Sequence, residues 1–334
     1  MDNILEVSGL NKRYGDFALK DISFYLPDGC ITGFVGVNGA GKTTTLRSIL
    51  GLTNKVSGNI KFFGMDMDGN ESKIKDRIGI VLDEGCFYDE LTLSEMKNVI
   101  APAYRNWCEQ DFIDYMEQFS LNPKQKINTL SKGMRMKYAL ALALSHKAEL
   151  LIMDEPTSGL DPLVRSQLLN ILKDYMGKGG KGVFFSTHIT SDLEKIADML
   201  IMIDGGEIVF QEEKDQLLDS YRIIKGSTEK LSTDTRKYFL NIEESAFGFT
   251  GITKQGADVM VHMQDVLTER PTIEDIMLIA SFLIPPVMLW RMPEAAGAMG
   301  FTLTVIFSIF MLTQYVSLKE YQYPKATTLL CGRK

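Results

Sequence analysis

A short glycine-rich segment near the amino terminus has the residue types of a phosphate-binding loop. Residues 36–44 read GVNGAGKTT and fit the pattern G-x-x-x-x-G-K-[ST]. In such a loop the glycines let backbone amides turn toward a phosphate, the lysine reaches the outer phosphate oxygens, and the next hydroxyl is a ligand for Mg²⁺. The segment therefore predicts a nucleoside triphosphate site in which Lys42 contacts phosphate and Thr43 helps to hold Mg²⁺.

Two acidic residues end an apolar segment later in the chain. Residues 150–155 read LLIMDE and are followed by Pro156. An acid at the carboxyl end of a buried parallel strand lies where open α/β sheets bind their ligands. We expect Asp154 to belong to the magnesium shell and Glu155 to act as a general base on water.

The surrounding pattern predicts the elements that would position these residues. Apolar or β-rich runs predict strands, and the helical runs that alternate with the later ones indicate βαβ units and a parallel sheet. The run after the glycine-rich loop predicts a helix that ends near Gly51. The expected strands are 4–10, 18–26, 30–36, 78–82, 149–154, 182–187 and 199–204, and the expected helices between the later strands are 162–176 and 191–197.

Helix-forming residues dominate the stretch from about 88 to 147. Three runs there, 93–107, 109–121 and 132–147, predict a helical insert within the α/β core. The mixed, charged stretch 213–275 predicts a small appended α/β region.

With these motifs in order, residues 4 to about 212 resemble the ATP-binding cassette of ABC transporters. The family's signature motif, usually LSGGQ, corresponds to LSKGM at 130–134, which keeps Ser131 and Gly133 but has Lys132 and Met134 in the altered positions. In the family this segment caps the ATP held by the opposite subunit. A lysine there keeps positive charge near phosphate, so we expect binding to be retained with an altered affinity.

Further landmarks of the family follow at the expected places. Asp161 ends a segment that resembles the D-loop, His188 resembles the histidine that senses the γ-phosphate, and Tyr14 resembles the aromatic that stacks on adenine. Where the family carries glutamine after the strand 78–82, this chain has Asp83 and Glu84, and we expect Asp83 to be a further Mg²⁺ ligand.

The resemblance implies a complete set of site residues. The expected catalytic residues are Glu155, His188 and Lys42, and the expected metal ligands are Thr43, Asp154 and Asp83. The expected nucleotide contacts are Tyr14, Gly36, Asn38, Gly39, Ala40, Gly41, Lys42, Thr43, Thr44, Ser131, Gly133 and Asp161.

The resemblance also implies the fold, an α/β P-loop NTPase of the ABC ATPase type. It would have a parallel-sheet core, an antiparallel β subdomain and an α-helical subdomain at about 88–148 within a cassette of residues 1–212. We expect residues 213–275 to form the accessory region and residues 276–334 a short hydrophobic hairpin.

The hydrophobic hairpin is predicted from two uncharged runs. They span residues 276–290 and 295–318, and the second has 24 residues. At ~1.5 Å per residue it would reach roughly 36 Å as a helix, more than the ~30 Å of a hydrocarbon core. The lysines and arginines that follow indicate that both ends face the cytoplasm. We interpret the hairpin as membrane-associated, with the hypothesis that it is a permease fragment; the alternative is that these helices pack inside a soluble domain.

Composition limits the remaining classes of function. The formal net charge of -7 is unsuited to a chain that neutralises nucleic-acid phosphates, so no nucleic-acid partner is expected. The four cysteines have no metal-like spacing and fit a reducing compartment.

The predicted function is that of an ATP-binding and ATP-hydrolysing subunit that energises an ABC exporter. The implied cofactors are ATP and Mg²⁺. The implied partners are a second cassette and a membrane permease, at the cytoplasmic face of the cell membrane. The alternative is a membrane-tethered or soluble ABC-type ATPase with a regulatory role, and the altered residues Asp83 and Lys132 keep that alternative open.

Overall fold

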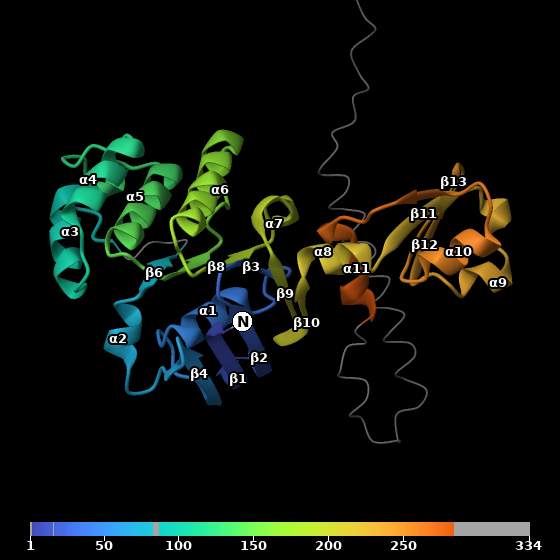
Figure 1. Cartoon of the computed structure of the whole chain (residues 1–334), viewed down its shortest axis with the longest axis horizontal. Helices are drawn as coiled ribbons and strands as arrows, with labels where there is room; N and C mark the ends of the chain where they lie inside the picture. Colours follow the sequence, from blue (N-terminus) through green and yellow to red (C-terminus); the bar gives the residue numbers. More distant parts are fainter. Residues whose placement is uncertain (1, 16, 83–86, 284–334) are drawn as a thin grey trace, which may run out of the picture. The chain divides into compact units, whose positions relative to one another are not determined.

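The computed structural model describes residues 2–15, 17–82 and 87–283 (Figure 1). Asp83 and the greater part of the expected hydrophobic hairpin therefore lie outside the described residues. Met1–Ser281 forms one compact unit. In the part of the chain that is described, no helix combines the length and apolar character needed to cross a bilayer.

A six-stranded sheet forms the core of this unit, in the order β10-β9-β3-β8-β7-β6. Neighbouring strands pair in parallel, except that β10 runs antiparallel to β9 at one edge. Strand β7, which lies between β8 and the edge strand β6, is buried along its whole length, as expected for a parallel strand covered on both faces. The strands are β3 (Cys30–Val35), β6 (Ile78–Val81), β7 (Leu150–Asp154), β8 (Gly182–Thr187), β9 (Met199–Asp204) and β10 (Glu207–Glu213).

A four-stranded antiparallel sheet, in the order β2-β1-β4-β5, lies beside helix α1. Its strands are β1 (Asn3–Tyr14), β2 (Phe17–Pro27), β4 (Ser57–Phe62) and β5 (Met65–Asp66), and the two helices nearby in sequence are α1 (Lys42–Ile49) and α2 (Glu71–Lys75). One hydrophobic cluster joins this sheet, α1 and one face of the core sheet, with Phe34, Leu46 and Phe184 among its members. Helix α1 is therefore packed between the two sheets, which fixes the loop that precedes it.

Helices α5 (Lys132–Ser145), α6 (Pro162–Gly177) and α7 (Thr190–Ile196) pack against the other face of the core sheet. Helices α3 (Leu93–Ile100) and α4 (Glu109–Gln118) pack in turn against α5 (Figure 1). The helix expected over 93–107 is wrong beyond Ile100, where a 3₁₀ turn, Ala101–Ala103, replaces it. Pro102 has no backbone N–H to continue an α-helix, and Tyr104 is extended.

The chain then forms a separate four-stranded antiparallel sheet, in the order β12-β13-β11-β14, with its own hydrophobic cluster. The elements after β10 are α8 (Lys214–Asp219), β11 (Arg222–Gly226), α9 (Thr233–Arg236), β12 (Asn241–Ser245), β13 (Gly248–Thr253), α10 (Gly256–His262), β14 (Leu267–Glu269) and α11 (Ile273–Leu283). Ile273 and Ile276 of α11 belong to the large core cluster under the helices. The boundary expected at residue 276 thus falls inside a helix, and the division at 212 remains a prediction.

The fold class is confirmed. The described chain contains the expected parallel core, the antiparallel β subdomain and the helical subdomain. Strands β4, β5 and β10 were not expected from the sequence.

Candidate functional site

The glycine-rich loop connects β3 to α1, as the sequence predicts. Two of its glycines are required by the local geometry. A Cβ atom at Gly36 would lie 2.3 Å from the backbone oxygen of Ile203, and Gly41 has a φ of 113° that side chains rarely adopt. The loop is therefore pressed against β9 and turns directly into the amino end of α1, where backbone N–H groups are free to meet an anion.

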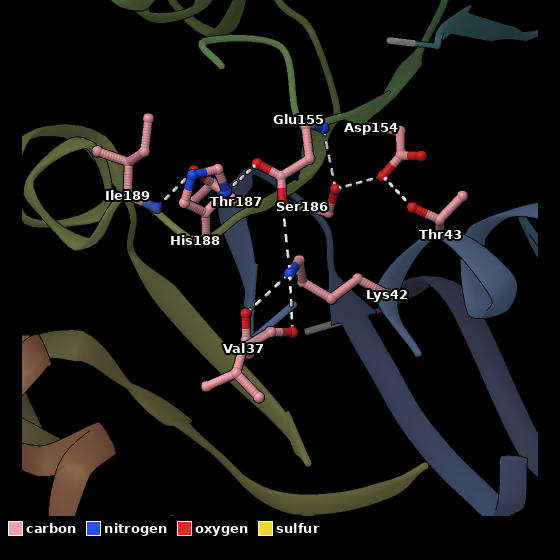
Figure 2. Close-up of polar contacts among 10 residues, drawn as sticks. Val37, Lys42, Thr43, Asp154, Glu155, Ser186, Thr187, His188 and Ile189 are labelled. Carbon is pink, nitrogen blue, oxygen red and sulfur yellow. Dashed lines mark hydrogen bonds and ion pairs between the residues drawn. The ribbon is translucent and has the colours of Figure 1, made fainter. Parts of the chain in front are cut away.

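Lys42 is folded back over this loop (Figure 2). The side chain is 6% exposed, and its Nζ donates to the carbonyl oxygens of Gly36 at 2.8 Å and Val37 at 3.3 Å. The same Nζ lies 3.3 Å from Glu155 Oε1. Lys42 therefore joins the phosphate loop to the carboxyl end of β7.

A second chain of contacts runs from α1 to β8 (Figure 2). Thr43 Oγ1 lies 3.2 Å from Asp154 Oδ1, and Ser186 Oγ donates to that same oxygen at 2.6 Å. Asp154 is 5% exposed, so its carboxylate is held in a largely dry setting. A hydroxyl and a buried carboxylate side by side are oxygen donors of the kind that Mg²⁺ prefers.

Glu155 has a left-handed backbone, with a φ of 48°. This conformation is costly for a residue with a Cβ, and two hydrogen bonds from its N–H hold it, to Ser186 O at 3.2 Å and Ser186 Oγ at 3.0 Å. The turn aims the carboxylate at both Lys42 and His188, whose Nδ1 lies 2.8 Å from Glu155 Oε2. Figure 2 shows the Glu155 carboxylate between His188 and Lys42, with one contact to each.

The residues expected to act from the signature motif and the D-loop form a second group. Ser131 caps α5 by accepting from Met134 N at 3.2 Å, and Asp161 caps α6 by accepting from Leu163 N and Val164 N, each at 3.0 Å. An added Cβ at Gly133 would lie 3.3 Å from Val164, so the two motifs are packed together. Within the described residues, Ser131 and Asp161 form no hydrogen bond or ion pair with Lys42 or Glu155, although the N–H of Ser158 at the start of the D-loop donates to Glu155 O at 3.1 Å.

Tyr14 stands apart at the end of β1. It is 74% exposed and pairs in the β1–β2 register with Phe17, whose ring Cζ would be 2.9 Å from a Cβ at Gly41. The hairpin that carries Tyr14 therefore contacts the phosphate loop. Asn38 and Gly39 are exposed in the loop, and Ala40 is buried.

Ser186 is the residue that the sequence analysis missed. It is fully buried and contacts both acids of the site, Asp154 through its hydroxyl and Glu155 through its hydroxyl and carbonyl oxygen. The signal in the sequence was a serine near the carboxyl end of the predicted strand 182–187, which follows the strand that ends in Asp154. Its significance required the pairing of β7 with β8, which places Asp154 opposite Ser186.

The fold and this site together define a P-loop ATPase of the ATP-binding cassette class. The chain matches the family model described as ABC transporter over residues 19–158. The bacitracin transport ATP-binding protein BcrA of Enterococcus faecalis is 28% identical over 78% of this chain and 85% of that protein. The linearmycin resistance ATP-binding protein LnrL of Bacillus subtilis (strain 168) is 36% identical over 62% of this chain and 68% of that protein.

Solved structures give the same result. An ATP-binding subunit of an ABC transporter is 28% identical, with a TM-score of 0.59 over 64% of this chain and 91% of its own length. A dimeric ATP-binding cassette bound to ADP and Pi is 22% identical, with a TM-score of 0.56 over 63% of this chain and 98% of its own, and shares the fold. The chain belongs to the ATP-binding proteins of ABC transporters and is the ATP-hydrolysing subunit of such a transporter.

Proposed function

We propose that this subunit energises export through a separate membrane permease, at the cytoplasmic face of the membrane. The names of its relatives support this direction, since they include proteins for bacitracin transport and linearmycin resistance. The single observation that carries the catalytic part is the line of contacts Lys42–Glu155–His188, built where the phosphate loop meets the ends of β7 and β8.

Each residue of that line has a distinct role. Lys42 would leave its carbonyl contacts for the outer phosphates, because a phosphate offers more negative charge than two carbonyl oxygens. Glu155 would orient and deprotonate the attacking water as general base. His188, which already contacts the carboxylate of Glu155, would hold Glu155 and the terminal phosphate in one arrangement.

The site also has the donors for Mg²⁺. Thr43 Oγ1 and the carboxylate of Asp154 would hold the ion, and Ser186 would orient that carboxylate through its hydrogen bond. When bound, the ion would neutralise charge on the phosphates. Asp83, the third expected ligand, remains a prediction.

We further propose that the complete site needs two cassettes. Ser131 and Asp161 lie at the starts of α5 and α6, both are exposed, and in this chain they make no described contact with Lys42 or Glu155. A partner cassette would bring its own copies to the phosphate held by Lys42. Amide groups at those helix starts suit a phosphate ligand. Tyr14 would stack on the adenine.

The test is the Mg²⁺-ATPase rate of the full chain over a series of protein concentrations, with Glu155→Gln beside it. We expect a rate that rises more steeply than concentration in the wild type, and an ATP-dependent dimer in the variant by light scattering. A rate strictly proportional to concentration, with no dimer in either protein, would contradict the two-cassette site. A binding-only regulator would show equal, negligible turnover in both proteins.

A further inference from the structure

We propose that the ion pair between Arg165 and Asp192 is a positioning device that fixes His188 relative to the D-loop. Arg165 lies in the first turn of α6, directly after the D-loop segment 158–161, and Asp192 lies in the first turn of α7. The inference rests on the catalytic role proposed for His188. It assigns a positioning function to Arg165 and Asp192, which contact neither the phosphate loop nor Glu155.

The carboxylate of this pair is buried, the guanidinium is partly exposed, and the contact is directional. Arg165 Nε lies 2.5 Å from Asp192 Oδ1, and Arg165 Nη2 donates to Ser191 Oγ at 2.7 Å. Asp192 is 0% exposed, and its Oδ2 has no hydrogen-bond partner among the described residues. A buried carboxylate that depends on one cation is costly to separate from it, so the distance between the two helices is held tightly here.

Helix α7 carries His188 at its entrance. Only Ile189 separates the histidine from the helix, and the N–H of Ile189 donates to Thr187 Oγ1 at 3.0 Å (Figure 2). On its inner side α7 is seated on β3, where a Cβ at Gly33 would lie 2.1 Å from Leu193 Cδ2. Arg165 supplies a second fixed point, on the side of α6. These two contacts restrain the position of α7, and therefore of His188 just before it, relative to β3 and α6.

Helix α6 is in turn packed against the signature segment. Val164, one residue before Arg165, is the nearest neighbour of a Cβ built at Gly133. A Cβ built at Gly159 of the D-loop would lie 3.5 Å from Lys132 Cδ. The long side chain of Lys132, where the family has glycine, therefore covers the D-loop. An adjustment of the signature segment on meeting a second cassette would reach α6, and through Arg165 and Asp192 it would reach His188.

The molecule contains a matched control pair. Arg77 Nε lies 2.5 Å from Glu149 Oε1, and Arg77 Nη2 lies 3.0 Å from Glu149 Oε2. Both partners are about 30% exposed at the amino ends of the core strands, away from the phosphate loop. Replacing either arginine by lysine keeps the charge and removes the planar guanidinium, although Arg77 in addition loses its stacking on Phe63.

The first arm of the test compares Arg165→Lys with Arg77→Lys in the full chain. We expect kcat of Arg165→Lys to fall by about 10- to 100-fold with KM for ATP changed less than about twofold, because a displaced catalytic group costs turnover rather than binding. Arg77→Lys should lower the melting temperature and leave kcat unchanged. Equal kcat in the wild type and both variants, or an equal fall in both variants, would overturn the proposal.

The second arm does not depend on turnover. The chain has three histidines, so the ring ¹⁵N signals can be assigned with His188→Ala, and those of His146 and His262 serve as internal references. We expect Arg165→Lys to shift the Nδ1 signal of His188, which contacts Glu155, and Arg77→Lys to leave it in place. An unshifted His188 signal in Arg165→Lys would overturn the proposal. Wild-type protein without ATPase activity would instead contradict the proposed function, and the ¹⁵N arm would still decide on the positioning role.

Discussion

The buried strand β7 has a glutamate at each end, and the two are held in opposite ways. Glu149 precedes the strand and faces Arg77 through two hydrogen bonds and Lys181 Nζ at 2.9 Å. Glu155 follows the strand in a left-handed conformation and faces Lys42 at 3.3 Å and His188 at 2.8 Å. The two glutamates thus flank the same strand, and the carboxylate of each has two basic neighbours.

The difference lies in what else those neighbours could bind. Hydrogen bonds from Arg77, together with Lys181, lower the pKa of Glu149 to about 2, so the carboxylate is satisfied and stays charged. The neighbours of Glu155 are themselves groups that a triphosphate would attract. We conclude that the contacts at the amino-terminal ends of these strands contribute stability, whereas the proposed function would use the charges at the carboxyl-terminal ends to bind a ligand.

The largest effect is expected for Lys42→Ala. Loss of a cation that would make two or more charge-assisted bonds to phosphate, each worth about 1.5–3 kcal/mol, should raise the Kd for ATP by about 1,000-fold. Isothermal titration of ATP into the full chain measures it. Lys173→Ala removes one exposed charge from α6 and is the control, with wild-type affinity expected. Unchanged affinity in Lys42→Ala would show that the loop does not use this lysine.

The next effect concerns His146, at the end of α5 near the amino edge. Burial lowers its pKa to about 4, its ring stacks on Tyr104 at 3.8 Å, and neither ring nitrogen has a described hydrogen-bond partner. The unfolded chain therefore binds a proton at higher pH than the folded one, and stability falls as pH drops from 6.5 toward 4. Protonation of His146 in the unfolded chain lowers the free energy of unfolding by about 3 kcal/mol over this range. In His146→Phe the fall over that pH range should be smaller by about this amount in urea titrations. Parallel curves would contradict it.

Acid should also act on Glu149, by a smaller amount. Its folded pKa is depressed, so its contribution is complete above about pH 4.5 and is lost as pH falls toward 2. After allowance for its partial exposure we expect Glu149→Gln to cost about 2 kcal/mol at pH 7 and to flatten this acid limb. Chemical denaturation at pH 7 and pH 3 tests this, and an equal cost at both values would show that the charge is not the cause.

The smallest effect is expected for Ser186→Ala. Loss of the hydroxyl that orients Asp154 and accepts from Glu155 should reduce kcat by roughly 5- to 10-fold, since neutral hydrogen bonds contribute about 1 kcal/mol each. Ser145→Ala is the matched control, because that buried hydroxyl only donates to Ala141 O within α5. It should alter the melting temperature and not kcat. A similar loss of turnover in both variants would remove Ser186 from the site.

Local patterns were sufficient to predict much of this architecture. The strands 182–187 and 199–204 were predicted at their observed bounds, because continuous apolar runs between turn residues have few other solutions. The phosphate loop and the acids at the end of β7 were likewise located by motif and spacing. The helix beyond Ile100 was overestimated, since one proline outweighed the helix propensity of its neighbours.

What the sequence could not show depends on pairing across the sheet. Ser186 becomes part of the site only because β7 and β8 place it opposite Asp154. Arg165 and Asp192 are 27 residues apart, and nothing in either helix alone indicates the other as its partner. Such contacts depend on how separate elements pack, which the pattern of a single segment does not contain.

The most direct test compares Glu155→Gln with Glu149→Gln, in the full chain at pH 7, by ATP turnover and by melting temperature. The account predicts that Glu155→Gln lowers turnover by about 100-fold or more with little loss of stability. It predicts that Glu149→Gln lowers the melting temperature and keeps turnover. Equal loss of turnover in the two variants, or full turnover in Glu155→Gln, would contradict the division between the two edges of the sheet.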